Sequence, residues 1–189
     1  MKQRARRDED KAERVGAILA AARELWEQSR ARDFTVGAVA GRAGIVKGTV
    51  YIYFPTKEHL LLAVFECLLD EYVDEVNGAL EKRRGRWSAE GVAGAIAAPL
   101  QEHHALLRLL PIVGSLNAKE AAAIASRCQT ETVLLLGSRM PALGHDDALS
   151  FLIRAYALLA GFAAMAFPDL EREFRESLTA LLHGMEKRK

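Results

Sequence analysis

Between residues 47 and 57 the chain carries side chains whose types suit binding to a phosphate-lined surface. Lysine supplies a positive charge, the hydroxyl groups of threonine and tyrosine bind phosphate oxygens, and glycine lets the backbone come close. The helix expected after Pro55 adds free N–H groups and the positive end of its dipole. The candidate binding residues of this stretch are Lys47, Gly48, Thr49, Tyr51, Tyr53 and Lys57.

No recognisable catalytic or metal-binding motif accompanies these residues. Ser, Cys and His do not fall in a nucleophile or acid–base arrangement, and a phosphate loop, an HExxH motif and a paired-carboxylate motif are absent. His103 and His104 point in different directions on a helix, which argues against a metal site. Cys67 and Cys128 lie in apolar helical patterns and are expected to be reduced core thiols. We therefore predict no enzyme activity, metal or cofactor.

The elements that position the candidate residues are two short helices joined by a tight turn, over residues 35–54. Thr35 can cap the first helix, and Gly44 stands where the chain must reverse direction. Ile45 and Val50 are expected to face inward, which leaves the polar residues outside. Helix, glycine-containing turn and helix form the helix-turn-helix pattern, although a hairpin whose tyrosines pack on neighbouring helices would share it. The inner face of the first helix would be Val36, Val39, Ala40 and Ala43.

The charge distribution points to a polyanionic partner at the N-terminal end. Residues 1–60 hold 12 Lys and Arg against 8 Asp and Glu, a net charge of +4, whereas residues 61–189 hold 14 against 17, a net charge of −3. The charged N-terminus lacks the apolar core of a signal peptide. Arg154 lies near the middle of the most apolar stretch and favours a buried helix over a membrane span. We expect a cytoplasmic protein that makes no membrane contact.

The rest of the chain has helical periodicity, which predicts an all-α protein. A three-helix N-terminal domain, residues 1–55, is joined by a connecting helix, residues 56–84, to a larger helical bundle, residues 85–189. Pro111, Pro141 and Pro168 are expected between helices, and Asp169 is expected to cap the last one. The helices are predicted at residues 14–30, 36–44, 46–54, 56–84, 88–99, 100–110, 117–139, 145–166 and 169–186.

The stretch from FTVGAVAGRAG through IVKGTVYIYFPTKEHLLLAVFE, residues 34–66, resembles the N-terminal domain of the TetR family of transcription regulators. The shared pattern is a Thr cap, an Ala-Gly turn, Lys-Gly-Thr-aliphatic-Tyr, an aromatic pair ending in Phe, and a Thr-Lys-Glu step. The resemblance implies a homodimer with the second short helix in the DNA major groove. It further implies a repressor of a pseudo-palindromic operator, with half-sites about one helical turn apart, that a small-molecule effector releases or alters.

The resemblance also implies roles for single residues. Lys47, Gly48 and Thr49 would enter the groove, while Tyr51 and Lys57 would grip phosphates. The basic residues of the first seven positions, Lys2, Arg4, Arg6 and Arg7, could reach a minor groove or form a disordered end.

Three further positions bear on the comparison with the family pattern. Thr35 matches a cap that often also touches the DNA backbone. Val46 stands where a Ser usually caps the recognition helix, so that cap should be missing. Ile52 replaces a His or another polar or aromatic residue, so its contact is apolar, for example with a thymine methyl group, or absent.

The last two helices, residues 145–186, are predicted to form the homodimer interface. Small residues such as Ala157, Ala160, Gly161 and Ala164 allow close approach of two backbones. The apolar area would come from Leu152, Tyr156, Leu159, Phe162 and Met165, which either the bundle itself or a second copy must cover.

An effector pocket is expected among the helices of residues 88–139, but no pocket residue can be singled out. Two alternatives to a DNA-binding regulator stay open: a helical protein-interaction module, and an all-α enzyme whose groups assemble from distant positions. Steep salt dependence of DNA binding would distinguish the regulator from the interaction module. The polar candidates for the pocket are His103, His104, Arg108, Asn117, Arg127, Cys128, Gln129 and Met140.

Overall fold

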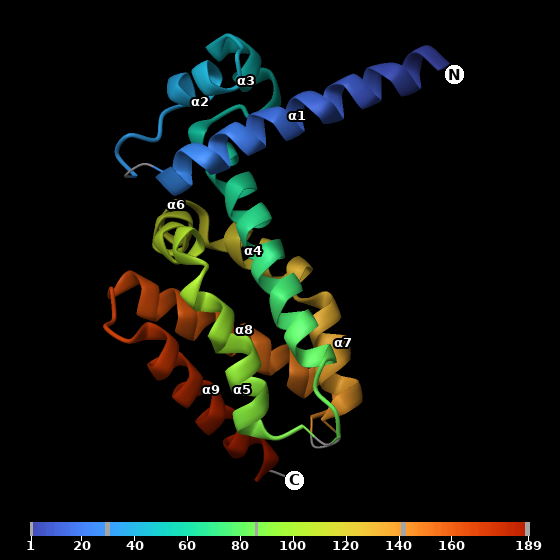
Figure 1. Cartoon of the computed structure of the whole chain (residues 1–189), viewed down its shortest axis with the longest axis vertical. Helices are drawn as coiled ribbons and strands as arrows, with labels where there is room; N and C mark the ends of the chain where they lie inside the picture. Colours follow the sequence, from blue (N-terminus) through green and yellow to red (C-terminus); the bar gives the residue numbers. More distant parts are fainter. Residues whose placement is uncertain (1, 29–30, 86, 141–142, 188–189) are drawn as a thin grey trace. The chain divides into compact units, whose positions relative to one another are not determined.

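The computed structural model describes residues 2–28, 31–85, 87–140 and 143–187, with side chains from Glu9 onward. Within these ranges every regular element is a helix and none is a strand, which confirms the predicted all-α class (Figure 1). The chain divides into two compact units, residues 1–64 (unit 1) and residues 65–189 (unit 2).

Unit 1 contains α1 (Lys2–Gln28), α2 (Val36–Arg42), α3 (Lys47–Tyr53) and the start of α4 (Lys57–Glu81). Two aromatic rings fill the centre of its core, where Trp26 and Phe34 meet edge to face with ring centroids 5.7 Å apart. Around them pack apolar side chains that are also removed from solvent: Ile18, Ala22, Val39, Val50, Leu60 and Val64.

Helix α1 begins well before the residue predicted for it. Periodicity marks only the part of a helix that packs on a core, and this part starts near Ile18. The preceding turns are built from charged residues that propagate a helix but carry no apolar stripe. The side chains of Lys2, Arg4, Arg6 and Arg7 lie outside the described side chains, so their minor-groove role stays a prediction.

Unit 2 is a helical bundle built around α8. Helices α6, α7 and α9 each pack on α8, and α5 packs along α9, as Figure 1 shows. The large aromatic residues of its core include Phe65, Tyr72, Trp87, Phe151 and Phe174. Besides the rest of α4, the unit contains α5 (Ala89–Ala97), the 3-10 helix η1 (Ala98–Gln101), α6 (His104–Cys128), α7 (Thr130–Arg139), α8 (His145–Ala164) and α9 (Leu170–Glu186).

The predicted helix end before Pro111 is wrong, whereas the predicted start at residue 117 matches a second segment of α6. Pro111 lies inside α6, where its missing N–H removes one hydrogen bond without ending the helix. The backbone leaves the helical region only at Asn117, with φ −154° and ψ 81°. Asn117 Oδ1 accepts a hydrogen bond of 3.0 Å from the N–H of Glu120 and so caps the second segment of α6. Pro141 lies outside the described residues.

The connection between α8 and α9 contains Pro168, as predicted, but Asp169 does not cap α9 through its side chain. Its backbone is left-handed, with φ +53°, so its carboxylate points away from the first N–H groups of the helix. Asp169 Oδ2 lies 3.7 Å from Arg172 Nη2 instead. The predicted cap at Asp169 is therefore wrong.

Helix α8 ends in a Schellman motif with an alanine at the left-handed position. Ala166 has φ +48°, the N–H of Phe167 donates to the carbonyl of Phe162 at 3.1 Å, and the N–H of Ala166 donates to that of Ala163 at 3.2 Å. The rings of Phe162 and Phe167, 5.2 Å apart, supply the accompanying apolar contact. Alanine pays a steric cost here that glycine avoids.

Replacement of Ala166 by glycine should raise the free energy of unfolding of unit 2. Relief of the left-handed backbone, about 1–2 kcal/mol, is partly offset by the greater freedom of glycine in the unfolded chain, about 0.5–1 kcal/mol. We expect a net gain of about 0.5–1 kcal/mol in urea unfolding. The matched control is Ala122→Gly inside α6, an exposed position at which glycine should lower stability by about 1 kcal/mol. Equal effects of the two substitutions would contradict this explanation.

Candidate nucleic-acid interface and ligand cavity

The helix-turn-helix predicted over residues 35–54 is formed by α2 and α3. Thr35 Oγ1 accepts a hydrogen bond of 3.1 Å from the N–H of Ala38 and caps α2, as expected. Gly44 occupies the turn with φ +67°, a backbone conformation that side chains rarely adopt. The N–H of Ile45 closes the turn on the carbonyl of Ala40 at 3.0 Å. Both of the local conformations that the turn needs are therefore present.

Burial fixes which face of α3 points outward. Val50 is fully buried, and Ile45 is half-buried at the turn. The inner face of α2 matches the prediction, since Val36, Val39 and Ala40 are buried and Ala43 is half-buried. With these side chains in the core, the opposite face of α3 lies in solvent.

The structure places the seven candidate residues in unit 1 at different depths. On α3, Lys47, Gly48 and Tyr51 are exposed, and Lys47 Nζ lies 5.7 Å from the centre of the Tyr51 ring. Thr49 and Tyr53 are half-buried. These five residues share the short helix α3, whereas the exposed Thr35 begins α2 and the exposed Lys57 begins α4.

His59, in the first turn of α4, is a functional candidate that was not predicted from the sequence. Thr56 Oγ1 accepts a hydrogen bond of 3.2 Å from the N–H of His59 and lies 2.8 Å from its Nδ1. A threonine followed three residues later by a polar side chain is a capping signature, which could have revealed the pair. Lys57 Nζ lies 5.7 Å above the Phe34 ring. A lysine and a histidine therefore stand at the positive end of the α4 dipole.

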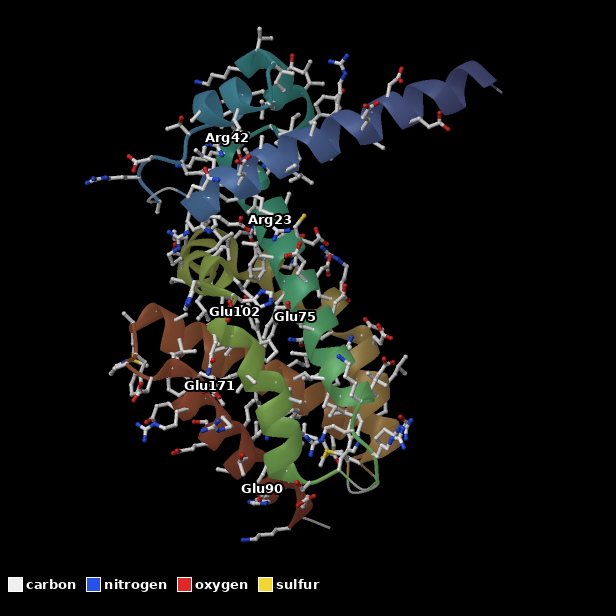
Figure 2. All side chains as sticks on the ribbon, in the orientation of Figure 1. Arg23, Arg42, Glu75, Glu90, Glu102 and Glu171 are labelled. Atoms are coloured by element: carbon white, nitrogen blue, oxygen red, sulfur yellow. The ribbon has the colours of Figure 1, made fainter. Side chains whose placement is uncertain are left out.

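Arg42, labelled in Figure 2, is a basic residue of α2 that is already paired. Its Nη1 lies 2.8 Å from Glu24 Oε1 and donates a hydrogen bond of 2.9 Å to Gln28 Oε1, both on α1. The guanidinium thus ties α2 to α1. We do not count Arg42 among the phosphate-binding candidates.

Two large apolar side chains stand in solvent around α3. Val46 is 72% exposed at the N-cap position and makes no side-chain cap bond, as expected from its type. Ile52 is 76% exposed on the helix itself. An exposed isoleucine beside exposed polar residues is a candidate for apolar contact with a base edge.

The substitution Val46→Ser should stabilise α3 by about 1 kcal/mol, because a serine hydroxyl can accept from an N–H of the first turn. Little burial is lost, since Val46 is mostly exposed. Urea unfolding of the variant measures the effect, with Val46→Ala as the matched control that shortens the side chain without adding a cap. Equal stability of the serine and alanine variants would rule out the missing cap as the cause.

A cavity of about 30 Å³ lies in the core of unit 2. The pocket was expected within residues 88–139, but its wall also draws on α4, α8 and α9, because the helices that enclose it are distant in sequence. Of the predicted polar candidates only Gln129 reaches it. The wall consists of Leu69, Tyr72, Val73, Val76, Ile96, Leu110, Gln129, Thr132, Leu152, Ala155, Tyr156, Leu159 and Phe174.

Two buried hydroxyl groups in the cavity wall are held by hydrogen bonds. The Tyr72 hydroxyl donates to the carbonyl of Ile96 at 2.6 Å, and burial raises the pKa of Tyr72. Thr132 Oγ1 donates to Asn77 Oδ1 of α4 at 2.7 Å. Tyr156 is half-buried, and desolvation raises its pKa also. The phenol groups of both tyrosines therefore stay neutral around the cavity.

The two adjacent histidines point in different directions, as predicted. His103 is buried against the Tyr72 ring at 5.5 Å, with Nε2 3.3 Å from Glu75 Oε1. That pair lacks the alignment of a hydrogen bond, since Nε2 has no hydrogen-bond partner. His104 is exposed. Across the described part of the chain, no group of three or more His, Cys, Asp or Glu residues could hold a metal ion.

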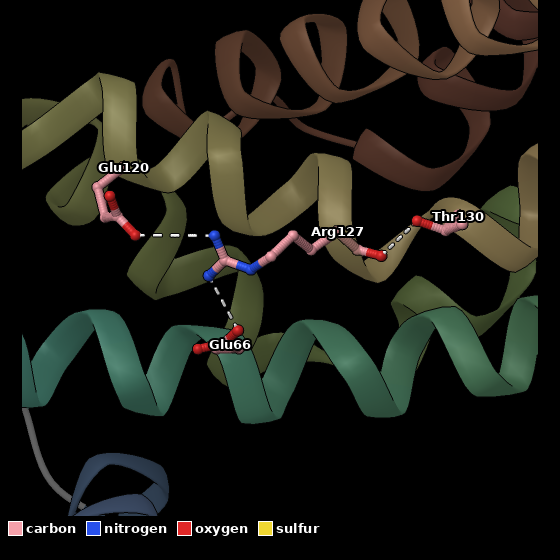
Figure 3. A network of polar contacts seen from close by, with 4 residues as sticks. All are labelled: Glu66, Glu120, Arg127 and Thr130. Carbon is pink, nitrogen blue, oxygen red and sulfur yellow. Dashed lines mark hydrogen bonds and ion pairs between the residues drawn. The ribbon is translucent and has the colours of Figure 1, made fainter.

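An exposed ionic network joins α4 to α6, shown in Figure 3. Arg127 Nη2 donates to Glu66 Oε1 at 3.1 Å, and its Nη1 lies 3.9 Å from Glu120 Oε1. The Thr130 hydroxyl donates to the carbonyl of Arg127 at 2.9 Å. Exposed pairs of this kind contribute little to stability. The predicted pocket residue Arg127 thus serves as a surface link.

The two cysteines are free and half-buried. Burial raises the pKa of the Cys128 thiol to about 12, and the neighbouring carboxylate of Asp70 adds to the shift. This thiol is therefore protonated and weakly nucleophilic at neutral pH.

Helix α8 presents an incompletely covered apolar face. Among the described residues, α8 is the helix long and apolar enough to cross a membrane by length and composition, a test that core helices of soluble proteins also pass. Ala157 and Ala164 are exposed and Met165 is 64% exposed. Leu152 and Leu159 are buried in the chain's own core and do not add to that face.

Family comparisons cover most of the chain. The model of bacterial regulatory proteins of the tetR family matches residues 18–64, and a model of the tetracyclin repressor-like C-terminal domain matches residues 66–169, which is more than half of the chain. The two matched segments lie on either side of the division between unit 1 and unit 2.

Curated relatives match through the N-terminal part. The chain is 43% identical over 65 residues to the HTH-type transcriptional regulator EthR of Mycobacterium tuberculosis, covering 34% of this chain and 28% of EthR. It is 34% identical over 70 residues to CymR of Pseudomonas putida, covering 37% and 34% of the two chains. The matched part therefore spans about a third of the length of these relatives.

Solved structures share the fold of the chain as a whole. The TetR family repressor AlkX from Dietzia has a TM-score of 0.71 at 18% identity and covers 90% of this chain and 94% of its own. RolR in complex with resorcinol has a TM-score of 0.67 at 19% identity and covers 92% of this chain and 89% of its own. At these identities the likeness establishes the fold alone.

Proposed function

This chain belongs to the TetR family of bacterial regulatory proteins, and from that premise we propose that it is a ligand-responsive DNA-binding regulator. The family consists of transcription regulators and not of enzymes. The observation that carries the proposal is the exposed face of α3, where Lys47, Gly48 and Tyr51 stand in solvent on a helix-turn-helix whose first helix is capped. We propose repression as its mode of action and the cytoplasm as its location.

On this proposal α3 enters the major groove of an operator half-site. Lys47, Gly48 and Thr49 lie at the end of α3 that approaches the bases. Tyr51 and Tyr53 bind phosphate oxygens through their hydroxyls. These contacts fix the register on the duplex, whereas base edges supply the sequence preference.

Two further residues bind the DNA backbone from outside α3. Lys57 lies in the first turn of α4, where its charge and the helix dipole both favour a phosphate. Thr35 caps α2 and is exposed, so its hydroxyl can also meet the backbone.

The regulator acts as a homodimer through α8 and α9, because a pseudo-palindromic operator needs two copies of α3. The exposed residues Ile153, Ala157 and Met165 supply an apolar face that a second copy covers. Its small residues let two α8 helices approach closely.

Effector binding in unit 2 alters DNA binding through α4. The first residues of α4 belong to unit 1 and the remainder to unit 2, so a change in the setting of α4 reaches both. The effector must bind the DNA-competent and the released forms with different affinity, typically by about 1–3 kcal/mol. RolR, which shares this fold, has been solved in complex with the ligand resorcinol, and this supports the proposal of a small-molecule site.

Fluorescence anisotropy with DNA from the region upstream of the chain's own coding sequence tests the proposal. We expect selective binding of two protein molecules per site and an affinity that falls steeply between two salt concentrations. A scrambled duplex is the control. Absence of binding at low salt would contradict the proposal and favour a protein-interaction module.

A further inference from the structure

The wall of the cavity in unit 2 carries no charged side chain. Leucine, valine, isoleucine, alanine and phenylalanine form most of it, and the polar remainder consists of two tyrosines, one threonine and one glutamine. A charged ligand would lose its hydration there and find no opposite charge. The wall therefore selects a neutral molecule.

The direction of the buried hydrogen bonds decides which polar group such a molecule needs. The carbonyl of Ile96 can only accept, so Tyr72 spends its single hydroxyl proton on that bond of 2.6 Å. The hydroxyl oxygen of Tyr72, a residue of the wall, therefore keeps lone pairs that can accept but has no proton to give.

The Thr132 hydroxyl is likewise left as an acceptor only, because it donates its proton to Asn77. The Glu131 carboxylate lies 3.5 Å from Asn77 Nδ2 and can only accept, so the amide oxygen of Asn77 faces Thr132. Thr132 must therefore donate its proton to Asn77, and its oxygen keeps free lone pairs. Both deep polar groups of the cavity are acceptors, which a ligand satisfies by supplying a donor.

The size of the cavity limits the ligand further. About 30 Å³ of free volume holds only one or two water molecules. A ligand larger than these water molecules must therefore displace part of the wall, in which Gln129 and Tyr156 are the half-buried side chains.

We propose that this cavity binds a neutral, compact, largely apolar molecule whose hydroxyl or N–H group donates to Thr132 Oγ1 or the Tyr72 hydroxyl oxygen. The proposal rests on the proposed function, in which unit 2 holds the effector site. Either hydrogen bond reaches α4, since Tyr72 lies on that helix and Thr132 Oγ1 bonds to Asn77 on it.

Calorimetric titration of the full chain with four benzene derivatives tests the ligand class. Benzyl alcohol is neutral and has a donor, ethylbenzene has the same size without one, benzoate is an anion, and benzylammonium is a cation. We expect benzyl alcohol to bind about tenfold more tightly than ethylbenzene, the effect of one hydrogen bond. Neither ion should bind. Binding of an ion as tight as that of benzyl alcohol, or no binding by any of the four, would overturn the proposal.

Variants of the wall assign the preference to named atoms. Thr132→Val should reduce benzyl alcohol binding about tenfold, to the level of ethylbenzene, and Thr132→Ser should restore it because the hydroxyl returns. Ala155→Leu should abolish binding of both neutral compounds by filling the cavity, while Ala122→Leu, on the exposed side of α6, should not. An unchanged preference in a folded Thr132→Val variant would refute the assignment.

DNA titration of the same samples separates this proposal from the function on which it rests. If the protein binds the four compounds in the expected order of affinity but does not bind operator DNA, only the proposal of a DNA-binding regulator is refuted. If the protein binds operator DNA but binds the four compounds in a different order of affinity, only the proposed ligand class is refuted.

Discussion

Replacement of Phe34 by alanine is expected to unfold unit 1 and abolish DNA binding. Phe34 is fully buried, meets Trp26 edge to face, and lies under the ammonium group of Lys57. Loss of a buried phenylalanine costs about 3–5 kcal/mol through lost burial and the cavity that remains. A unit of this size has little stability to spare, since small domains bury a smaller share of their surface.

The two tryptophans make this result measurable in each unit separately. Trp26 lies in unit 1 and Trp87 in unit 2, so Trp87→Phe and Trp26→Phe backgrounds report on one unit each. In Phe34→Ala the Trp26 signal should unfold at much lower urea concentration, while the Trp87 signal stays unchanged. Phe34→Leu, which keeps most of the volume, should cost less than about 1.5 kcal/mol. A shift of both signals together would contradict independent unfolding of unit 1.

Replacement of Lys57 by alanine is expected to weaken binding to every duplex by the same factor. Each protomer would lose one phosphate contact, and a dimer on its operator would lose two. At about tenfold for each charge-assisted contact, the affinity falls about a hundredfold. The slope of log affinity against log salt concentration should fall by about 2, since each contact releases about one counterion.

Anisotropy titrations on the operator and on a scrambled duplex measure both effects. Lys57→Arg should keep most of the affinity because the charge remains. Lys119→Ala removes an exposed lysine of α6 and should leave DNA binding unchanged. If Lys57→Ala weakened binding to only one of the two sequences, the residue would read bases and the phosphate role would be wrong.

The parts of the fold that sequence predicted are those that neighbouring residues determine. Thr35 and Gly44 act on backbone groups within a few residues of themselves, so the helix-turn-helix follows from local chemistry. The N-cap position of α3 likewise lacks a side-chain hydrogen bond because the Val46 side chain has no polar atom. Local rules fail at Pro111, because the helix tolerates a lost hydrogen bond when its apolar face is packed: Leu109, Leu110 and Val113 are buried.

The cavity in unit 2 could not be predicted because no local pattern marks it. Polar side chains were the expected mark of a pocket, whereas the wall is mostly apolar and its residues serve the core at the same time. Tyr72 and Thr132 are sixty residues apart in the chain and act together only after folding. The prediction at Asp169 failed for a different reason. Aspartate is a common capping residue, but here its left-handed backbone directs the side chain away from the first N–H groups of α9.

The pairing of arginines in unit 1 has a consequence for how the regulator searches a chromosome. Arg42, Arg23 and Arg32 each stand beside a carboxylate, at 2.8, 2.8 and 3.8 Å, so fewer charges are free to hold arbitrary DNA than the count of basic residues suggests. Millions of competing sites hold a regulator mainly through such charges. On the proposed function, weaker capture by these sites leaves a larger share of the protein free to bind its operator.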